Sequence, residues 1–234
     1  MTDLSERYDA ETAAAWILGH ARRTSVPLLP EELGKKTADE CTDGEREFLL
    51  RAGLDAGLKL YPFKRGTMEL ARTRRTLGFL HSLSFESMLD VGSGRGVFLL
   101  PFLKEFPWVR VTSVDILEKR VVFLGELADG GFPLLSVERR DICGAPYPEN
   151  SFDVVTMLEV LEHIPDVGAA VRNACRIARR CVIVTVPSKP DDNPEHIHLL
   201  TRPKLEGLFQ AAGCRALRFD AVPGHLVLFA KKGA

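Results

Sequence analysis

Strand-like and helix-like segments alternate along the chain after residue 84, and this alternation restricts the fold more than any other feature of the sequence. It is the order expected for a mostly parallel sheet with helices on both faces, a Rossmann-like α/β fold. We predict seven strands, at residues 87–91, 110–114, 134–139, 152–158, 181–186, 215–220 and 226–230. Helices are predicted between them, at 97–105, 118–128, 167–177 and 203–212. Only residues 221–225 join the last two strands, too few for a parallel crossover, so these strands should form a C-terminal antiparallel hairpin.

Residues 1–84 are predicted to form an N-terminal helical cap, because apolar side chains recur there at helical spacing. Asp9, Asp43 and Thr67 are the predicted N-caps of its helices. The stretch 26–34 carries two prolines and a glycine and should separate the first helix from the second. A few short helices bury little surface by themselves. We therefore interpret this region as a cap on a sheet domain, residues 85–234, and not as an independent domain.

The overall charge of the chain gives no preference for a strongly charged partner. The chain has 31 lysines and arginines against 32 aspartates and glutamates, so nothing favours a polynucleotide or a membrane surface overall. Its five cysteines form no C-x-x-C pair and no zinc spacing, which suits reduced thiols in a cytosol. The first residues carry acids where a signal peptide carries positive charge, and no apolar run reaches the length of about 18 residues that a membrane span needs. A cytoplasmic location without a membrane partner is predicted.

A glycine-rich turn follows the first predicted strand, where SMLDVG leads into GSGRG and then into an apolar helix. A strand, a glycine turn and a helix N-terminus together let the backbone approach a ligand closely. The glycines fall at 92, 94 and 96, whereas the nicotinamide dinucleotide fingerprint requires a glycine at 97, where this chain has Val97. The spacing weighs against a dehydrogenase. Taken alone, it is equally compatible with a tight strand-to-helix bend that binds nothing.

Two acids follow the next two predicted strands and extend this pattern. Asp115 ends the second strand, about 20 residues past the glycines, where a carboxylate can accept hydrogen bonds from ribose hydroxyls. Asp141 and Ile142 follow the third strand, where the acid can accept from an adenine amino group and the apolar side chain can cover the ring. With Asp90 at the first strand, the three acids should converge on the carboxyl edge of the sheet. Ligands bind at that edge in such folds.

Four stretches, in this order, resemble the signature of class I S-adenosylmethionine-dependent methyltransferases: DVGSGRG, VTSVDIL, RRDICGAPYPENSFDVVTMLEVLEHIPD and VPSKPDDNPEHIHLLTRPKLEGLFQAAG. The similarity covers roughly residues 85–232, and residues 1–84 match no family pattern. It implies S-adenosyl-L-methionine as cofactor and a seven-stranded sheet whose sixth and seventh strands form a hairpin. The segment count above leads to the same sheet.

The resemblance also assigns roles to particular residues. Asp90 and the glycine turn would surround the methionine moiety, and Asp115 with Ile116 would contact the ribose and adenine. Asp141 and Ile142 would contact the adenine edge, and the residues ending the fourth strand would line the wall nearest the sulfonium. The complete set of predicted cofactor-binding residues is Asp90, Gly92, Ser93, Gly94, Gly96, Asp115, Ile116, Asp141, Ile142, Leu158 and Glu159.

Methyl transfer from a sulfonium needs mainly alignment of the acceptor, which by itself can contribute on the order of 7–11 kcal/mol. A base of near-neutral pKa helps where the acceptor is a hydroxyl or a protonated amine. Within EVLEH and EHIHLL the predicted catalytic residues are Glu159, His163 and His198, and Glu162 and His196 are further candidates. The alternative is that EVLEH has a structural role, with a carboxylate that caps a helix or holds the methionine amino group.

A metal site is a second alternative for the same motif. E-x-x-E-H followed by a later histidine resembles the Mg²⁺ or Mn²⁺ site of small-RNA 3′-terminal ribose 2′-O-methyltransferases, and the ligands would be Glu159, Glu162, His163 and His198. Two carboxylates and two imidazoles suit Mn²⁺ or Fe²⁺ better than Mg²⁺. Only about 35 residues separate the two halves, however, and residues 1–84 lack an evident RNA-binding module. No metal is therefore included in the predicted site.

Residues 59–75, KLYPFKRGTMELARTRR, hold six basic residues against one acid, with Tyr61 and Phe63 among them. The segment suits a positively charged lid that recognises an anionic acceptor. More often such a run is a solvated helix face whose arginines lie over apolar surface, and the charge alone favours this second interpretation.

The function predicted from these features is S-adenosylmethionine-dependent methylation of a small molecule, because a helical cap would enclose an acceptor pocket and no polynucleotide groove is suggested. Methylation of RNA or protein, served by segment 59–75, is the alternative, and nucleic acid is the less favoured partner. The non-enzyme alternative is a protein that binds the cofactor without turnover. The acceptor and the oligomeric state are not defined by the sequence.

S-adenosyl-L-methionine should raise the free energy of unfolding by about 2.7 kcal/mol at a concentration one hundred times its dissociation constant. Asp115→Ala should remove most of this gain, because the variant lacks the predicted ribose acceptor. Thermal denaturation with and without cofactor measures both effects. Stabilisation by nicotinamide dinucleotides and not by S-adenosyl-L-methionine would refute the cofactor assignment.

Overall fold

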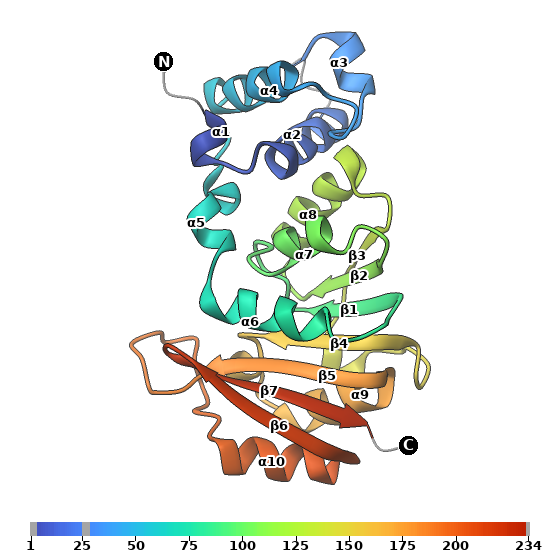
Figure 1. Ribbon diagram of the computed structural model, residues 1–234, viewed down its shortest axis with the longest axis vertical. Helices are drawn as coiled ribbons and strands as arrows, with labels where there is room; N and C mark the ends of the chain where they lie inside the picture. Colours follow the sequence, from blue (N-terminus) through green and yellow to red (C-terminus); the bar gives the residue numbers. More distant parts are fainter. Residues whose placement is uncertain (1–3, 25–28, 233–234) are drawn as a thin grey trace.

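A seven-stranded sheet forms the centre of the molecule in the computed structural model, which describes residues 4–24 and 29–232 (Figure 1). The strands lie in the order β3-β2-β1-β4-β5-β7-β6. Their bounds are β1 (Ser87–Val91), β2 (Arg110–Asp115), β3 (Leu135–Arg139), β4 (Phe152–Leu158), β5 (Ala178–Pro187), β6 (Cys214–Val222) and β7 (His225–Lys232). Strands β1 to β5 pair in parallel, while β7 pairs antiparallel with both β5 and β6. The predicted fold, including the terminal hairpin, is confirmed.

Helices cover both faces of this sheet. Side chains along each strand point alternately to the two faces, so each strand contributes to an apolar cluster on either side. Met88 and Val154 belong to one apolar cluster, and their neighbours Leu89 and Val155 belong to the other. The first cluster includes side chains of α6 (Ala71–Leu80), α7 (Leu99–Glu105) and α8 (Glu118–Gly131). The second includes those of α9 (Val167–Ile177) and α10 (Arg202–Ala211). None of the helices in the described ranges is both long and apolar enough to cross a membrane.

Most element boundaries agree with the sequence patterns, and the differences have local causes. Strands 87–91 and 152–158 and helix 167–177 have the predicted bounds. The helix predicted from residue 97 begins at Leu99, because the glycine turn extends further into the chain than expected. Asp9 caps α2 (Ala10–Thr24), since its side chain accepts a hydrogen bond from the backbone N–H of Thr12.

Two predicted caps are wrong. The N-cap of α4 (Asp43–Asp55) is Thr42 and not Asp43, because Thr42 and Glu45 form a reciprocal capping box. Thr67 lies inside the short helix α5 (Arg65–Met68), and the following helix α6 begins after Leu70. The break predicted at 26–34 is too long, because residues 31–34 of it belong to α3 (Glu31–Lys35), and residues 26–28 lie outside the described residues.

The N-terminal helices α1 (Leu4–Arg7) to α4 lie beyond the β3 end of the sheet, where α2 packs on α8 and contacts α3 and α4 (Figure 1). Helices α2 and α8 approach until their backbones touch: a Cβ on Gly19 would lie 1.7 Å from the carbonyl oxygen of Glu126. The buried carboxylate of Glu126 accepts a hydrogen bond from the indole N–H of Trp16 at 2.8 Å and lies 2.9 Å from Nδ1 of His20. These helices share one apolar cluster with the sheet. Division of the chain into a cap, 1–84, and a sheet domain, 85–234, remains a proposal.

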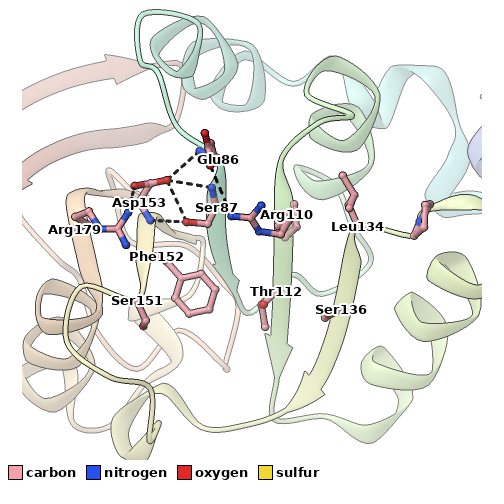
Figure 2. A pocket seen from close by; sticks show the side chains of 12 residues that line it. Glu86, Ser87, Arg110, Thr112, Leu134, Ser136, Ser151, Phe152, Asp153 and Arg179 are labelled. Atoms are coloured by element: carbon pink, nitrogen blue, oxygen red, sulfur yellow. Dashed lines mark hydrogen bonds and ion pairs between the residues drawn. The ribbon is translucent and has the colours of Figure 1, made fainter.

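At the amino edge of the sheet, Asp153 joins neighbouring strands around a hollow of 360 Å³ (Figure 2). One carboxylate oxygen of Asp153 accepts hydrogen bonds from the backbone N–H groups of Glu86 and Ser87, and the other lies 3.0 Å from Nη1 of Arg179. Burial alone would raise the pKa of Asp153, but these hydrogen bonds and the charge of Arg179 lower it. Asp153, the buried acid of this hollow, is thus fully paired within the protein, so we interpret the hollow as structural.

Gly19→Ala should destabilise the protein by on the order of 3 kcal/mol, because its methyl group cannot fit unless α2 and α8 separate. Gly207→Ala is the matched control. Gly207 lies exposed in α10 with open space around it, so alanine should be neutral or stabilise the helix by about 0.5–1 kcal/mol. Urea denaturation measures both, and equal stability of the two variants would contradict the close packing of α2 on α8.

Candidate functional site

The glycine turn lies where the strand order reverses direction, between the carboxyl ends of β1 and β4. Gly92, Gly94 and Gly96 all have positive φ angles, of 66°, 58° and 77°. A Cβ on Gly92 would lie 2.6 Å from Val160, and one on Gly96 would lie 2.9 Å from Leu100. A Cβ on Gly94 would meet no side chain within 4 Å. Gly92 and Gly96 are thus required for packing, while Gly94 faces open space.

The two predicted ribose and adenine acids hold the loops around this turn. Asp115 is buried at the end of β2, where it accepts hydrogen bonds from the backbone N–H groups of Gly94 at 3.2 Å and Leu117 at 2.9 Å. Asp141 is exposed and accepts from the backbone N–H of Cys143 at 2.8 Å, at the start of η2 (Ile142–Gly144). Each acid therefore shapes its loop and keeps lone pairs available to a ligand.

Two hollows lie at this edge and share Gly92, Gly94 and Glu159. The larger has a volume of 490 Å³, which is in the range of small-molecule sites. Of the predicted residues, it is lined by Gly92, Gly94, Asp115, Ile116, Asp141, Ile142, Glu159 and His163. The smaller, of 180 Å³, is lined by the predicted residues Asp90, Gly92, Ser93, Gly94, Leu158 and Glu159. Gly96 and His198 line neither hollow.

The sequence interpretation missed Arg72 and Thr73, which line the smaller hollow from α6. Arg72 belongs to the basic segment 59–75, and that charge run was the only signal for it. Two other basic residues of the segment are engaged elsewhere. Arg75 pairs with Asp220, and Nε of Arg65 donates to the carbonyl oxygen of Ser5 at 2.9 Å. Arg72 is the basic residue of this segment that lines a hollow in the described part of the chain.

Asp90, in β1 just before the glycine turn, is more buried than Asp115 or Asp141. Loss of solvent raises its pKa to about 6, and hydrogen bonds from Ser93 and Thr156 oppose this rise. Thr156 donates to one carboxylate oxygen of Asp90 at 2.6 Å. No cation among the described residues pairs with Asp90. The negative charge at Asp90 is therefore poorly compensated within the protein.

Glu159 follows β4 with a positive φ of 60°, which is uncommon for a residue other than glycine. Its carboxylate accepts a hydrogen bond from Thr185 at 2.7 Å and lies 3.0 Å from Nε2 of His225. Thr185 belongs to β5 and His225 to β7, the next two strands of the sheet after β4. Glu159 therefore lines both hollows in a fixed orientation.

Glu162 lies in η3 (Leu161–His163) and is only 1% exposed. Neither of its carboxyl oxygens has a hydrogen-bond partner among the described residues. Burial raises the pKa of Glu162 to about 8, and the charges of Glu159 and Asp191 contribute further. Such a buried, unpartnered acid is uncommon in a folded protein and indicates a missing partner.

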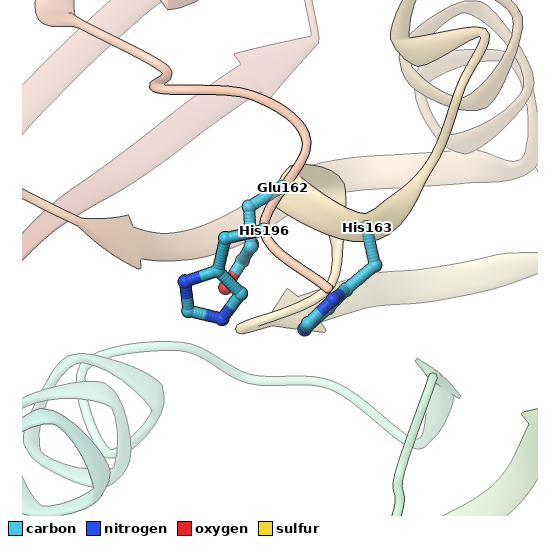
Figure 3. Close-up of side chains that lie close together, drawn as sticks. All are labelled: Glu162, His163 and His196. Atoms are coloured by element: carbon cyan, nitrogen blue, oxygen red, sulfur yellow. The ribbon is translucent and has the colours of Figure 1, made fainter. Parts of the chain in front are cut away.

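Two histidines lie beside Glu162, and they are not the pair predicted (Figure 3). The rings of His163 and His196 have centroids 4.8 Å apart, and the donor atoms of Glu162, His163 and His196 all lie within 4.8 Å of one another. Nε2 of His198 lies instead 3.4 Å from the carbonyl oxygen of Pro165. The structure thus brings His196 to this cluster and places His198 elsewhere.

Comparison with known proteins identifies the fold. Residues 61–218 match a family described as a methyltransferase domain. The chain belongs to this methyltransferase family. Its fold is that of the class I S-adenosylmethionine-dependent enzymes, so S-adenosyl-L-methionine is the family's cofactor. A methyltransferase of this kind from Aquifex aeolicus superposes with a TM-score of 0.61 at 20% identity, covering 71% of this chain and 93% of that one.

Two curated methyltransferases are similar to this chain over part of their length. The 27-O-demethylrifamycin SV methyltransferase of Amycolatopsis mediterranei is 35% identical over 122 residues, which are 48% of this chain and 43% of that protein. The ubiquinone biosynthesis O-methyltransferase of Pseudomonas putida is 35% identical over 103 residues, 42% of each protein. The chain thus matches less than half the length of these relatives.

The residues at the carboxyl edge fit this cofactor. The open space at Gly94 admits a ligand to the backbone, and Ile116 presents a 60% exposed apolar side chain beside the hollow where an adenine ring can cover it. The uncompensated carboxyl of Asp90 suits the cationic end of the methionine moiety, and Arg72 lies in the same hollow, where it suits a carboxylate.

The stability difference between wild type and Asp90→Asn should depend on pH. Because the folded-state pKa of Asp90 is raised from 3.8 to about 6, its contribution to stability is fully present below about pH 4 and is lost as pH rises to about 6. The wild type should therefore lose about 2 kcal/mol relative to Asp90→Asn between pH 4.5 and 7.5. Urea denaturation at both pH values measures the difference, in which other titrating groups cancel. A difference independent of pH would contradict the buried state of Asp90.

Proposed function

We propose that this chain transfers the methyl group of S-adenosyl-L-methionine to a hydroxyl oxygen of a small molecule. The observation that carries the proposal is the pair of adjoining hollows that share Gly92, Gly94 and Glu159. They are lined by acids from three successive strands and continue toward His163. The names of the two relatives, a demethylrifamycin methyltransferase and an O-methyltransferase of ubiquinone biosynthesis, support oxygen as the acceptor atom and a small molecule as the substrate.

In this proposal the smaller hollow holds the methionine end of the cofactor. Asp90 binds the ammonium group, Arg72 binds the carboxylate, and the backbone at Gly94 approaches the ligand closely. Asp115 accepts hydrogen bonds from ribose hydroxyls with the lone pairs that its two backbone contacts leave available.

The larger hollow holds the adenine. Ile116 and Ile142 cover the ring from apolar side chains, and Asp141 accepts from the amino group at the mouth of the hollow. Leu158 and Glu159, at the end of β4, form the wall nearest the reacting sulfur. We propose that Gly96, which lines neither hollow, acts through the turn that it allows by packing against Leu100.

Bound S-adenosyl-L-methionine supplies a methyl group on a positively charged sulfur, so that a C–O bond forms as the C–S bond breaks. The protein's main task is then to align the acceptor, and alignment contributes on the order of 7–11 kcal/mol. Glu159, fixed by Thr185 and His225, shapes the wall against which the acceptor lies. His163 lines the larger hollow and can take the hydroxyl proton. His198 lies outside both hollows, so we assign it no part in the reaction.

A small acceptor fits the charge distribution better than a polymer. Among the basic residues of segment 59–75, Arg72 alone lines a hollow in the described part of the chain. A polynucleotide needs a continuous basic surface to neutralise successive phosphates. A cytoplasmic location also remains a prediction.

Incubation with methyl-labelled S-adenosyl-L-methionine and a cell extract should place the label in small molecules that organic solvent extracts. Gly94→Val is the matched control, because its side chain would enter the space that we assign to the cofactor, and it should label nothing. Valine at the positive φ of position 94 also strains the turn, so thermal denaturation must establish that the variant is folded.

Label found in acid-precipitable RNA or protein would overturn the small-molecule assignment. Binding of the cofactor with no transfer to any fraction would overturn the enzymatic assignment.

A further inference from the structure

We propose that Glu162, His163 and His196 bind one first-row divalent metal ion beside the acceptor end of the larger hollow (Figure 3). Their donor atoms lie within 4.8 Å of one another, close enough for a single ion to contact all three after small side-chain rotations. One carboxylate oxygen and two imidazole nitrogens suit Mn²⁺, Fe²⁺, Co²⁺ or Zn²⁺ better than Mg²⁺ or Ca²⁺, which prefer oxygen ligands.

The first argument is the burial of Glu162. Its side chain is 1% exposed, and both carboxyl oxygens lack a hydrogen-bond partner among the residues that the structure describes. A carboxyl group buried without a partner loses the hydrogen bonds that water would provide, which disfavours folding. A cation beside the two histidines would provide that partner. A purely structural role leaves this cost unexplained.

The second argument is the orientation of the two histidines. Nδ1 of His163 lies 2.9 Å from the carbonyl oxygen of Glu195, and Nδ1 of His196 lies 2.8 Å from the carboxylate of Asp191. Histidines that bind metals typically use one ring nitrogen in this way, on a carbonyl or carboxylate, and bind the ion with the other. The two contacts fix both rings and leave Nε2 of each ring for the ion.

The third argument is the connection between the two segments that provide the donors. Glu162 and His163 follow β4, whereas His196 belongs to the segment after β5. The backbone N–H of Ile197 donates to the carbonyl oxygen of Glu162 at 3.0 Å, which fastens one segment to the other. The cluster is thus held in place by the backbone as well as by the side chains.

The geometry excludes the ligand set suggested by the sequence motif alone. Glu159 is held by Thr185 and His225, and His198 lies against the carbonyl of Pro165. Three protein ligands leave coordination positions open. Because His163 also lines the larger hollow, a hydroxyl of the acceptor can reach the ion from there and lose its proton more easily. With the ion bound to Nε2 of His163, this histidine no longer serves as the base, and the proton passes to water.

The ion would also narrow the class of acceptors, which rests on the proposed function. The ion would select acceptors with a hydroxyl beside a second oxygen, such as a catechol or an α-hydroxyketone, because two adjacent oxygens can occupy two open positions. Acceptors with an isolated hydroxyl would gain less from the ion.

Metal binding can be tested without cofactor or acceptor. After removal of bound metals with a chelator, titration with CoCl₂ should show one site per chain by calorimetry, with a change in visible absorption from imidazole ligation. Glu162→Gln and His196→Ala should each weaken binding at least about 100-fold, and Asp191→Asn, which removes the carboxylate that orients His196, about 10–100-fold. His198→Ala is the matched control and should bind as the wild type does. Thermal denaturation shows that each variant is folded.

Absence of a stoichiometric site, or binding that survives both Glu162→Gln and His196→Ala, would overturn the metal site. Loss of binding in His198→Ala alone would overturn the ligand assignment. The labelling assay then separates this inference from the proposed function. Turnover that persists after chelation shows a methyltransferase without a metal requirement and refutes the role given to the ion. Metal binding without any turnover refutes the proposed function and leaves the site intact.

Discussion

The hydrogen bond from the backbone N–H of Gly94 to the carboxylate of Asp115 organises the carboxyl edge of the sheet. It joins the turn after β1 to the end of β2, and it forms only because residues 92, 94 and 96 adopt positive φ angles. Side chains at positions 92 and 96 would collide with Val160 and Leu100, so these two glycines pack tightly against the protein. A side chain at position 94 would meet no other side chain within 4 Å. The ligand space follows from this difference between neighbouring glycines.

Local patterns predict the sheet well, because burial on both faces imposes apolar runs on parallel strands and turns must interrupt them. The strand at 152–158 and the helix at 167–177 follow directly from such runs. The cap at Thr42 was missed because two residues compete for it, and only the reciprocal contact with Glu45 decides between them. The placement of the N-terminal helices on α8 depends on Gly19 and Gly130, whose close approach has no periodic signal in the sequence.

The site could likewise be predicted only in part from local sequence patterns. Asp115 and Asp141 could be located from the strand order, since each follows a strand that ends at the same edge. The choice between His196 and His198 could not, because both lie in an irregular segment where spacing does not determine direction. A backbone hydrogen bond between Ile197 and Glu162 sets that segment, and this non-local contact turns His196 toward His163. Arg72 was hidden in a basic run whose other members mostly lie away from the hollows.

Two buried carboxyl groups flank the site, and each is a position where we propose that a cationic ligand binds. Asp90 lies at the methionine end and Glu162 near the acceptor end, and loss of solvent is the main cause of the raised pKa of both. Neither forms a salt bridge within the described residues, although the charge of Arg72 partly lowers the pKa of Glu162, so each costs folding free energy that a hydrophobic residue would not. A cationic ligand recovers this cost when it binds. We propose that the ammonium group of the cofactor binds at Asp90 and a metal ion at Glu162. The same two carboxyl groups then lower the stability of the free protein and strengthen the binding of its ligands.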